Sequence, residues 1–326
     1  MARFITRRLL IIPLGIALAV TLAYAYAHLV QWDYADRYPE LRQRLAVTER
    51  PTSLVDAYGT YVQGLLRFDM GTLRSGASIA QTLRQALGAS LGLLSIALLV
   101  SIPLGLGLGI AAARWSRLRP AGWLTALSTL GLAMPSFYVG SLLILLSVAY
   151  AFVRKGSGGL PFPLTGFGWD RHLVFPVLAL MARPTVQTAQ VTATLLTGEL
   201  QKPYVVAARS LGHQRGTVKR RHAFRNVLAP VALTIATSLR TLVADLILVE
   251  WLFFWPGIGR FLASALIPAD RTNMASSPYL LEPSFVAPLL GIVAAIFLIA
   301  DFVASVLVRA LDPRLRVSVK EELPDV

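Results

Sequence analysis

The chain contains no cysteine, and only 15% of its 326 residues are charged, whereas an average soluble domain has about a quarter. The absence of cysteine excludes disulfide bonds and thiolate metal sites, and it leaves the redox compartment undetermined. The four histidines form neither a His-Glu-x-x-His sequence nor a paired metal-ligand spacing, so we expect no metal site. The sequence Gly-x-x-x-x-Gly-Lys-Ser/Thr is also missing, so this chain is not expected to hydrolyse ATP.

Hydrophobic residues make up 55% of the chain and fall in long runs with few or no charges, which is typical of membrane-spanning helices. We expect six spanning helices, over Leu9–Val30, Leu87–Ala113, Ala121–Val153, Leu173–Thr197, Val227–Trp255 and Ser284–Val308. A cleaved signal peptide is the alternative for the first run, which is long for that role. The third run exceeds the roughly 30 Å hydrocarbon core and contains Pro135, so it must tilt, kink or begin at the interface.

Glycine pairs in the second run, Gly88/Gly92 and Gly105/Gly109, have the spacing that lets helices approach closely in lipid. We therefore expect this run to pack tightly against another spanning helix.

The last three runs contain ionisable residues: Arg183, Arg240, Asp245, Glu250 and Asp301. Such groups are costly inside a span and usually face the bundle interior or a water-filled cavity. Arg240 and Asp245 are therefore candidate pore-lining residues. Five positions apart, they lie about 140° around the helix axis, so they cannot face one narrow stripe. The alternative is a structural role for both, with a helix partner such as Asp301 or Arg183.

Lysine and arginine give the chain a formal net charge of +14. Nucleic-acid binding is one explanation, but the basic residues cluster between apolar runs, as the positive-inside rule describes, so we expect no nucleic-acid partner. The basic segments 114–120 and 198–225, and with them both chain termini, are placed in the cytoplasm. Segment 31–86 then lies outside. We expect a partly helical cap there, with a solvated connector as the alternative.

The cytoplasmic segment 198–226 is too long for a tight turn. Tyr204–Gly212 is predicted to form a short helix with a glycine at its C-terminal end. A second, strongly basic helical piece is predicted over Thr217–Asn226, running into Pro230. A short helix that protrudes from the bundle would offer a handle to a cytoplasmic partner.

The pattern Tyr204-x-x-x-Ala208-Arg209-x-x-Gly212, followed by residues 221–226 and Pro230, resembles the EAA loop of ABC importer permeases. More narrowly, it is similar to the peptide and nickel transporter permeases. Further stretches in chain order resemble the same family: Arg3-Phe4-Ile5, Phe68-Asp69-Met70-Gly71-Thr72, Ile102-Pro103-Leu104-Gly105, Met134-Pro135-Ser136-Phe137, Trp255-Pro256-Gly257-Ile258-Gly259-Arg260 and Leu311-Asp312-Pro313-Arg314.

The resemblance implies an all-α integral membrane protein of the type I ABC importer permease fold, with six transmembrane helices and cytoplasmic termini. It divides the chain into a first helix (1–30), an external cap (31–86), a five-helix permease core (87–316) with its coupling loop (about 198–226), and a C-terminal tail (317–326). The residues implied to couple the chain to an ATPase are Tyr204, Ala207, Ala208, Arg209 and Gly212. Val206 replaces the glutamate of the general pattern.

The implied partners are a second homologous permease subunit, two ATP-binding cassette subunits that carry ATP and Mg, an external solute-binding protein and membrane lipid. No cofactor is expected in this chain. The basic cluster Arg215–Arg221 would meet either acidic ATPase surface or lipid headgroups. A non-identical partner permease is favoured over a homodimer.

Peptides are the cargo that the resemblance favours, with nickel chelates or oligosaccharides as alternatives for the same machinery. Two other classes of membrane protein are alternatives. An ion-driven secondary transporter would often show an internal repeat, and none is evident. An intramembrane protease would need a catalytic pair, for which Asp245 and Asp301 are the available aspartates.

Overall fold

The computed structural model describes residues 2–37, 39, 53–67, 69–115, 119–154, 162–266 and 279–311. Within these ranges the chain is helical and contains no strand, apart from an isolated bridge between Thr72 and Ser78. The all-α fold class is therefore confirmed. The elements are α1 (Ala2–Arg37), α3 (Leu54–Leu66), α4 (Ile79–Ala112), α5 (Gly122–Ala133), α6 (Ser136–Val153), η1 (Arg171–Leu173), α7 (Val174–Glu199), α8 (Pro203–Ser210), α9 (Arg215–Thr217), η2 (Val218–Ala223), α10 (Phe224–Leu252), α11 (Ile258–Leu266) and α12 (Pro283–Leu311).

Among the described residues, five helical stretches are long and apolar enough to cross a membrane: α1, α4, α6, α10 with its preceding turns, and α12. The remaining expected span, Leu173–Thr197, corresponds to α7, which has 26 residues but a more polar composition. It packs against α4, α5, α6 and α10, and the side chains of Thr185, Thr188 and Thr192 are buried. Because its neighbours shield these hydroxyl groups from lipid, α7 does not need an apolar surface all round.

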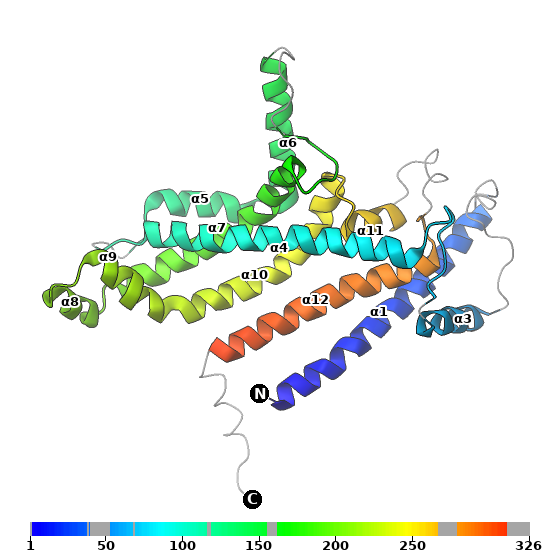
Figure 1. The fold of residues 1–326 in the computed structure, drawn as a ribbon, viewed down its shortest axis with the longest axis horizontal. Helices are drawn as coiled ribbons and strands as arrows, with labels where there is room; N and C mark the ends of the chain where they lie inside the picture. Colours follow the sequence, from blue (N-terminus) through cyan, green and yellow to red (C-terminus); the bar gives the residue numbers. More distant parts are fainter. Residues whose placement is uncertain are drawn as a thin grey trace, which may run out of the picture.

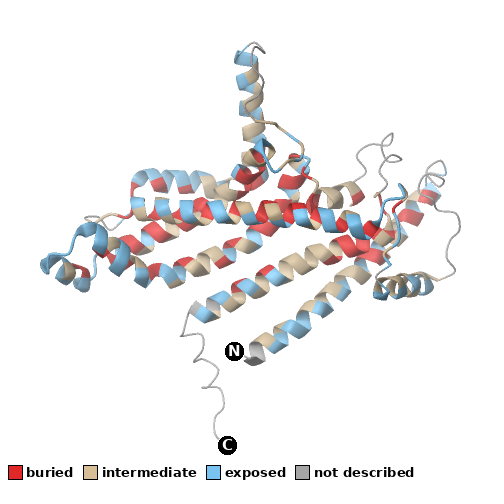
Figure 2. Cartoon of the chain, viewed as in Figure 1, coloured by how far each residue is buried: buried red, intermediate tan, exposed pale blue. Residues whose placement is uncertain are grey.

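Buried residues concentrate along α4, α7 and α10 and in the first turns of α12, whereas α1 keeps a broad exposed face (Figure 2). The most extensive helix contact among the described residues is between α4 and α7, where Gly105 and Gly109 face threonines of α7. This confirms the expected role of that glycine pair. The other pair behaves differently: Gly92 lies against the Trp169 ring, and the space around Gly88 is open.

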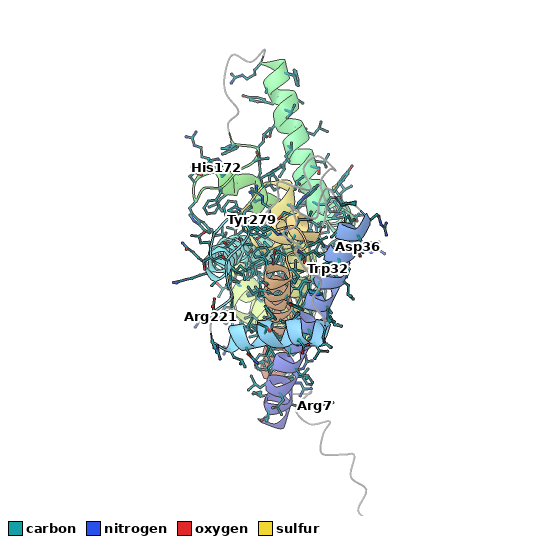
Figure 3. The ribbon with its side chains drawn as sticks, turned by 90° about the vertical axis from the view of Figure 1, so that its right-hand side faces the viewer. Arg7, Trp32, Asp36, His172, Arg221 and Tyr279 are labelled. Atoms are coloured by element: carbon teal, nitrogen blue, oxygen red, sulfur yellow. The ribbon has the colours of Figure 1, made fainter. Side chains whose placement is uncertain are left out.

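The third apolar run is divided at Pro135 into α5 and α6, so of the three expected alternatives (a tilt, a kink or a start at the interface) the structure shows the kink. Proline offers no backbone N–H to α5 and holds Met134 in an extended conformation, with φ −93° and ψ 121°. As a result, α6 leaves the bundle at a steep angle (Figure 1). In the view along the long axis, α6 rises from one edge of the molecule and Arg7 of α1 marks the opposite edge (Figure 3).

The external segment is partly helical, as expected, although the helices on either side extend into it. The first helix continues to Arg37, and α4 begins at Ile79, where the Ser78 hydroxyl accepts a hydrogen bond from the Gln81 amide (3.5 Å). Between them lies α3, and an Arg74–Glu282 ion pair of 3.0 Å ties the approach to α4 to the start of α12. Residues 40–52 of the expected cap lie outside the described residues.

The start of α1 and the end of α12 point toward the same end of the molecule as α8 (Figure 1). These two helices pack side by side, and Arg8 of α1 forms an ion pair with Asp301 of α12. The arrangement agrees with the predicted orientation, in which both termini share a side with the basic loop. The Asp312-Pro313 end signal and the tail 317–326 lie outside the described residues.

The glycine contact predicts a position-specific cost for an added methyl group. A Cβ at Gly109 would lie 2.7 Å from the carbonyl oxygen of Ala189, whereas one at Gly107 would enter open space. We expect Gly109→Ala to destabilise the protein by ~1–3 kcal/mol through overpacking. Gly107→Ala is the control, because both changes give the same gain in helix propensity. Thermal unfolding of the purified variants measures the difference, and equal midpoints would contradict the contact.

Candidate functional site

The predicted cytoplasmic helix is present as α8, which begins with Pro203 at its first turn and ends at Ser210. Gly212 follows it with φ +84°, a conformation that side chains with a Cβ rarely adopt. The Gly212 amide donates to the Arg209 carbonyl (3.0 Å), and the His213 amide donates to the Ala208 carbonyl (3.3 Å). These two bonds form a Schellman motif, so the predicted glycine ending is confirmed.

The helix α8 has an inner and an outer face. Val205 is buried, and Ala208 packs beside it against the ends of α7 and η2. Val206 is 60% exposed and Leu211 is 80% exposed, and Ala207 lies on the same open side. An exposed apolar surface on a helix at the cytoplasmic tip is typical of a protein interaction site.

The base of α8 is held by a polar cluster, here called the Glu199 cluster, of Glu199, Lys202, Tyr204 and Asn226. The Glu199 carboxylate accepts hydrogen bonds from the Tyr204 hydroxyl (2.8 Å) and the Asn226 amide (3.0 Å). Its second oxygen pairs with the Lys202 ammonium at 2.6 Å. The Asn226 amide also donates to the Tyr204 oxygen (3.0 Å), so the cluster joins α7, α8 and α10.

Glu199 is only 7% exposed, and its hydrogen-bond partners offset the cost of burying its charge. Burial, together with the hydrogen bond donated to Glu199, raises the pKa of the Tyr204 phenol. The phenol therefore stays protonated and keeps its role as a donor. Sequence reasoning assigned no role to Glu199, although it is the single acid in a strongly basic loop and that isolation was a usable signal.

The five predicted coupling residues lie on α8 or directly after it, but they do not share one environment. Tyr204 belongs to the Glu199 cluster, and the Arg209 guanidinium lies over the Trp115 ring at 5.5 Å. Ala208 faces inward, whereas Ala207 and Gly212 are exposed. Three of the five, Tyr204, Ala208 and Arg209, therefore contact other parts of this chain. Contact between the exposed residues and an ATPase stays a prediction.

The predicted helical conformation of Thr217–Asn226 is confirmed, but its prediction as a separate element is wrong. Helical turns run without a break from Arg215 through the π-helical turn Val218–Ala223 into α10. Pro230 does not stop this helix; it lies inside α10. The basic segment is thus the cytoplasmic extension of a spanning helix.

The two charged residues of the fifth span contact different helices, as their angular separation predicts. The Arg240 guanidinium pairs with Asp301 of α12 at 2.5 Å, which is one of the partners expected for a structural role. The Asp245 carboxylate accepts a 2.5 Å hydrogen bond from the Ser136 hydroxyl at the start of α6. The Arg240 side chain is still 46% exposed. A pore-lining role for either residue stays a prediction.

A second buried carboxylate was not assigned a role from sequence. Glu250 accepts hydrogen bonds from the Ser90 hydroxyl (2.5 Å) and the Gly259 amide (2.6 Å). The Ser90 oxygen in turn accepts from the Ile258 amide (2.8 Å). Glu250 and Ser90 therefore satisfy free amide groups in the first turn of α11 and hold that helix against α4 and α10.

The Glu199 cluster predicts how α8 responds to mutation. Because the chain has no cysteine, Val206→Cys allows one spin label on the exposed face of α8. In this background, Glu199→Ala should increase the mobility of the label, because Tyr204 and Asn226 both lose their acceptor. Lys202→Gln removes one exposed ion pair and should change mobility much less. Equal spectra for wild type and Glu199→Ala would contradict the proposed restraint.

The chain matches a protein family over most of the structure described above. The family model described as binding-protein-dependent transport system inner membrane component matches residues 105–317. The peptide transport system permease protein SapB of Salmonella typhimurium is 29% identical over 258 residues, covering 69% of this chain and 77% of that protein. The putrescine export system permease protein SapB of Escherichia coli is 28% identical with the same coverage.

The oligopeptide transport system permease protein OppB of Mycobacterium bovis is 28% identical over 348 aligned positions, covering 98% of this chain and 100% of that protein. The family match includes α5 to α12, and therefore the whole of α8 and the Glu199 cluster. Together with the apolar helices, it identifies a multi-pass protein of the inner membrane. The chain belongs to the family of binding-protein-dependent transport system inner membrane components.

Proposed function

We propose that this chain is one of two permease subunits of an ABC importer for peptides, and that it forms half of the translocation pore. ATP and Mg bind to two separate ATP-binding cassette subunits, and an external solute-binding protein delivers the cargo. This chain carries no cofactor of its own. The names of the relatives support this assignment, since two of the three cited above are peptide or oligopeptide permeases.

The observation that carries the proposal is the construction of α8. Its outer face presents Val206, Ala207 and Leu211 to the cytoplasm, and small or apolar side chains allow close approach by a partner. Its inner face is tied through Glu199 to α7 and α10. A push on α8 by an ATPase subunit would therefore reach two spanning helices directly.

The partner permease is supported by α6. This helix leaves the bundle, and its large apolar side chains, including Leu145, Leu146 and Phe152, are exposed in the single chain. In the membrane such a surface is covered by lipid or by another subunit. We propose that the second permease packs against part of it.

The relatives support the class of transporter more strongly than they support the identity of its cargo. The name of the Escherichia coli relative refers to export of putrescine, a small dication, so the cargo and even the direction of transport need a direct test. Reconstituted vesicles with the partner permease, the ATPase subunits and the binding protein should accumulate a labelled peptide only with ATP. Accumulation of a polyamine instead, or transport in the opposite direction, would contradict the peptide-import proposal.

Gly212 provides a test of coupling. Gly212→Trp adds a bulky group beside α8, and we expect uptake to fall more than ten-fold, while membrane insertion is kept and ATP hydrolysis loses its link to transport. Asparagine tolerates the left-handed conformation, so Gly212→Asn is the matched control and should retain most uptake. The measurement is the ratio of peptide transported to ATP hydrolysed. A wild-type ratio in Gly212→Trp would exclude docking at this position.

Arg240 and Asp245 provide a test of the pore. We propose that Arg240, which stays partly exposed beside Asp301, offers charge to a peptide terminus. Arg240→Gln and Asp245→Asn are near-isosteric neutralisations, and uptake is measured per assembled complex. Reduced uptake with normal assembly is expected for Arg240→Gln. Loss of assembly in both variants would assign both residues to structure, and wild-type uptake in both would remove the pore role.

A further inference from the structure

A cavity of about 580 Å³ lies at the cytoplasmic end of α4, between this helix and the α9–η2 turns. Gly107, Ile110 and Ala111 of α4 form its apolar side. Thr217, Lys219 and Arg220 contribute hydroxyl and cationic groups to the other side. This volume lies within the range of about 300–1,000 Å³ that is typical of small-molecule sites.

The charged side chains that line this cavity are all of one sign. Among the described residues that line it, Lys219 and Arg220 are basic and none is acidic. The Lys219 ammonium donates a 2.8 Å hydrogen bond to the Ala113 carbonyl at the end of α4, which fixes its position at the rim. Two adjacent cations without an acid in the same cavity favour an anionic ligand.

The apolar residues on the α4 side of the cavity indicate which kind of anion would bind. Residues 107–111 belong to the charge-free run of α4, close to its cytoplasmic end, so they lie at the level where acyl chains meet headgroups. A soluble partner docking from the cytoplasm would meet α8 and the outer arginines before it reached this depth. A ligand that fills both sides needs an anionic head and an apolar tail.

We propose that this cavity binds the headgroup of an anionic phospholipid, with the phosphate beside Lys219 and Arg220 and the first acyl carbons against Gly107 and Ala111. Basic cavities between spanning helices on the cytoplasmic side are suited to this chemistry. Because the α9–η2 turns run directly into α10, the bound lipid would join α4 to the helix that also carries Asn226 of the Glu199 cluster.

The geometry offers two independent ways to weaken the site. Arg220→Gln removes one of the lining charges, and Arg221→Gln is the matched control, because Arg221 is exposed on the same turn but does not line the cavity. Gly107→Leu fills the cavity without changing any charge. A Cβ at Gly107 meets no atom within 4 Å, so the backbone accepts the substitution.

The experiment uses the assembled transporter in nanodiscs that contain a photoactivatable phosphatidylglycerol, and it measures labelling of the peptide that includes residues 107–111. Arg220→Gln should lower labelling about five-fold, since the loss of one direct ion pair with the phosphate, about 1 kcal/mol, corresponds to that factor. Gly107→Leu should lower it at least as much. Arg221→Gln should leave it unchanged, and a phosphatidylcholine probe should label weakly.

Several results would overturn the proposal. Equal losses in Arg220→Gln and Arg221→Gln would indicate general surface attraction, and equal labelling by phosphatidylcholine would exclude headgroup selection. Loss of labelling in excess inorganic phosphate at constant ionic strength would assign the cavity to a free anion. Labelling that appears only without the ATPase subunits would assign this face to the protein interface.

Discussion

The close contact between α4 and α7 is the constraint on which the rest of the structure depends. Gly105 and Gly109 let the two backbones approach, and the threonines of α7 fill the space above them. Because α7 is surrounded by α4, α5, α6 and α10, its polar side chains are hidden from lipid and its direction is fixed. The packing of α7 therefore fixes the position of its C-terminal end, and of Glu199, at the cytoplasmic surface.

Contacts at the C-terminal end of α7 connect this helix directly to α8 and α10. Glu199 holds Tyr204 of α8 and Asn226 of α10, while the Arg209–Trp115 contact reaches the segment after α4. The inner side of α8 therefore packs against other helices of the same chain, and its outer side stays exposed for a partner. At the opposite end Glu250 holds α11 against α4 and α10. Two buried carboxylates thus fix the two ends of the same helical core.

The apolar runs were sufficient to predict the fold class and most spanning helices, because a charge-free stretch of that length has few other stable environments. Gly212 was also predictable, since its role depends on local backbone conformation. The Glu199 cluster was not, because Asn226 is 27 residues from Glu199 and meets it only when α10 returns beside α7. Likewise, Pro135 predicted a kink, but the direction of α6 depends on contacts such as Ser136–Asp245 that sequence spacing does not reveal.

The central claim is that α8 moves together with the cytoplasmic ends of α7 and α10. It is tested most directly by the distance between spin labels at Val206→Cys on α8 and Leu228→Cys on α10, both exposed positions in a chain without other cysteines. The measurement compares the assembled transporter without nucleotide and with ATP bound. The account predicts one narrow distance distribution that is the same in both states. A shift or a broadening of this distribution on ATP binding would contradict it.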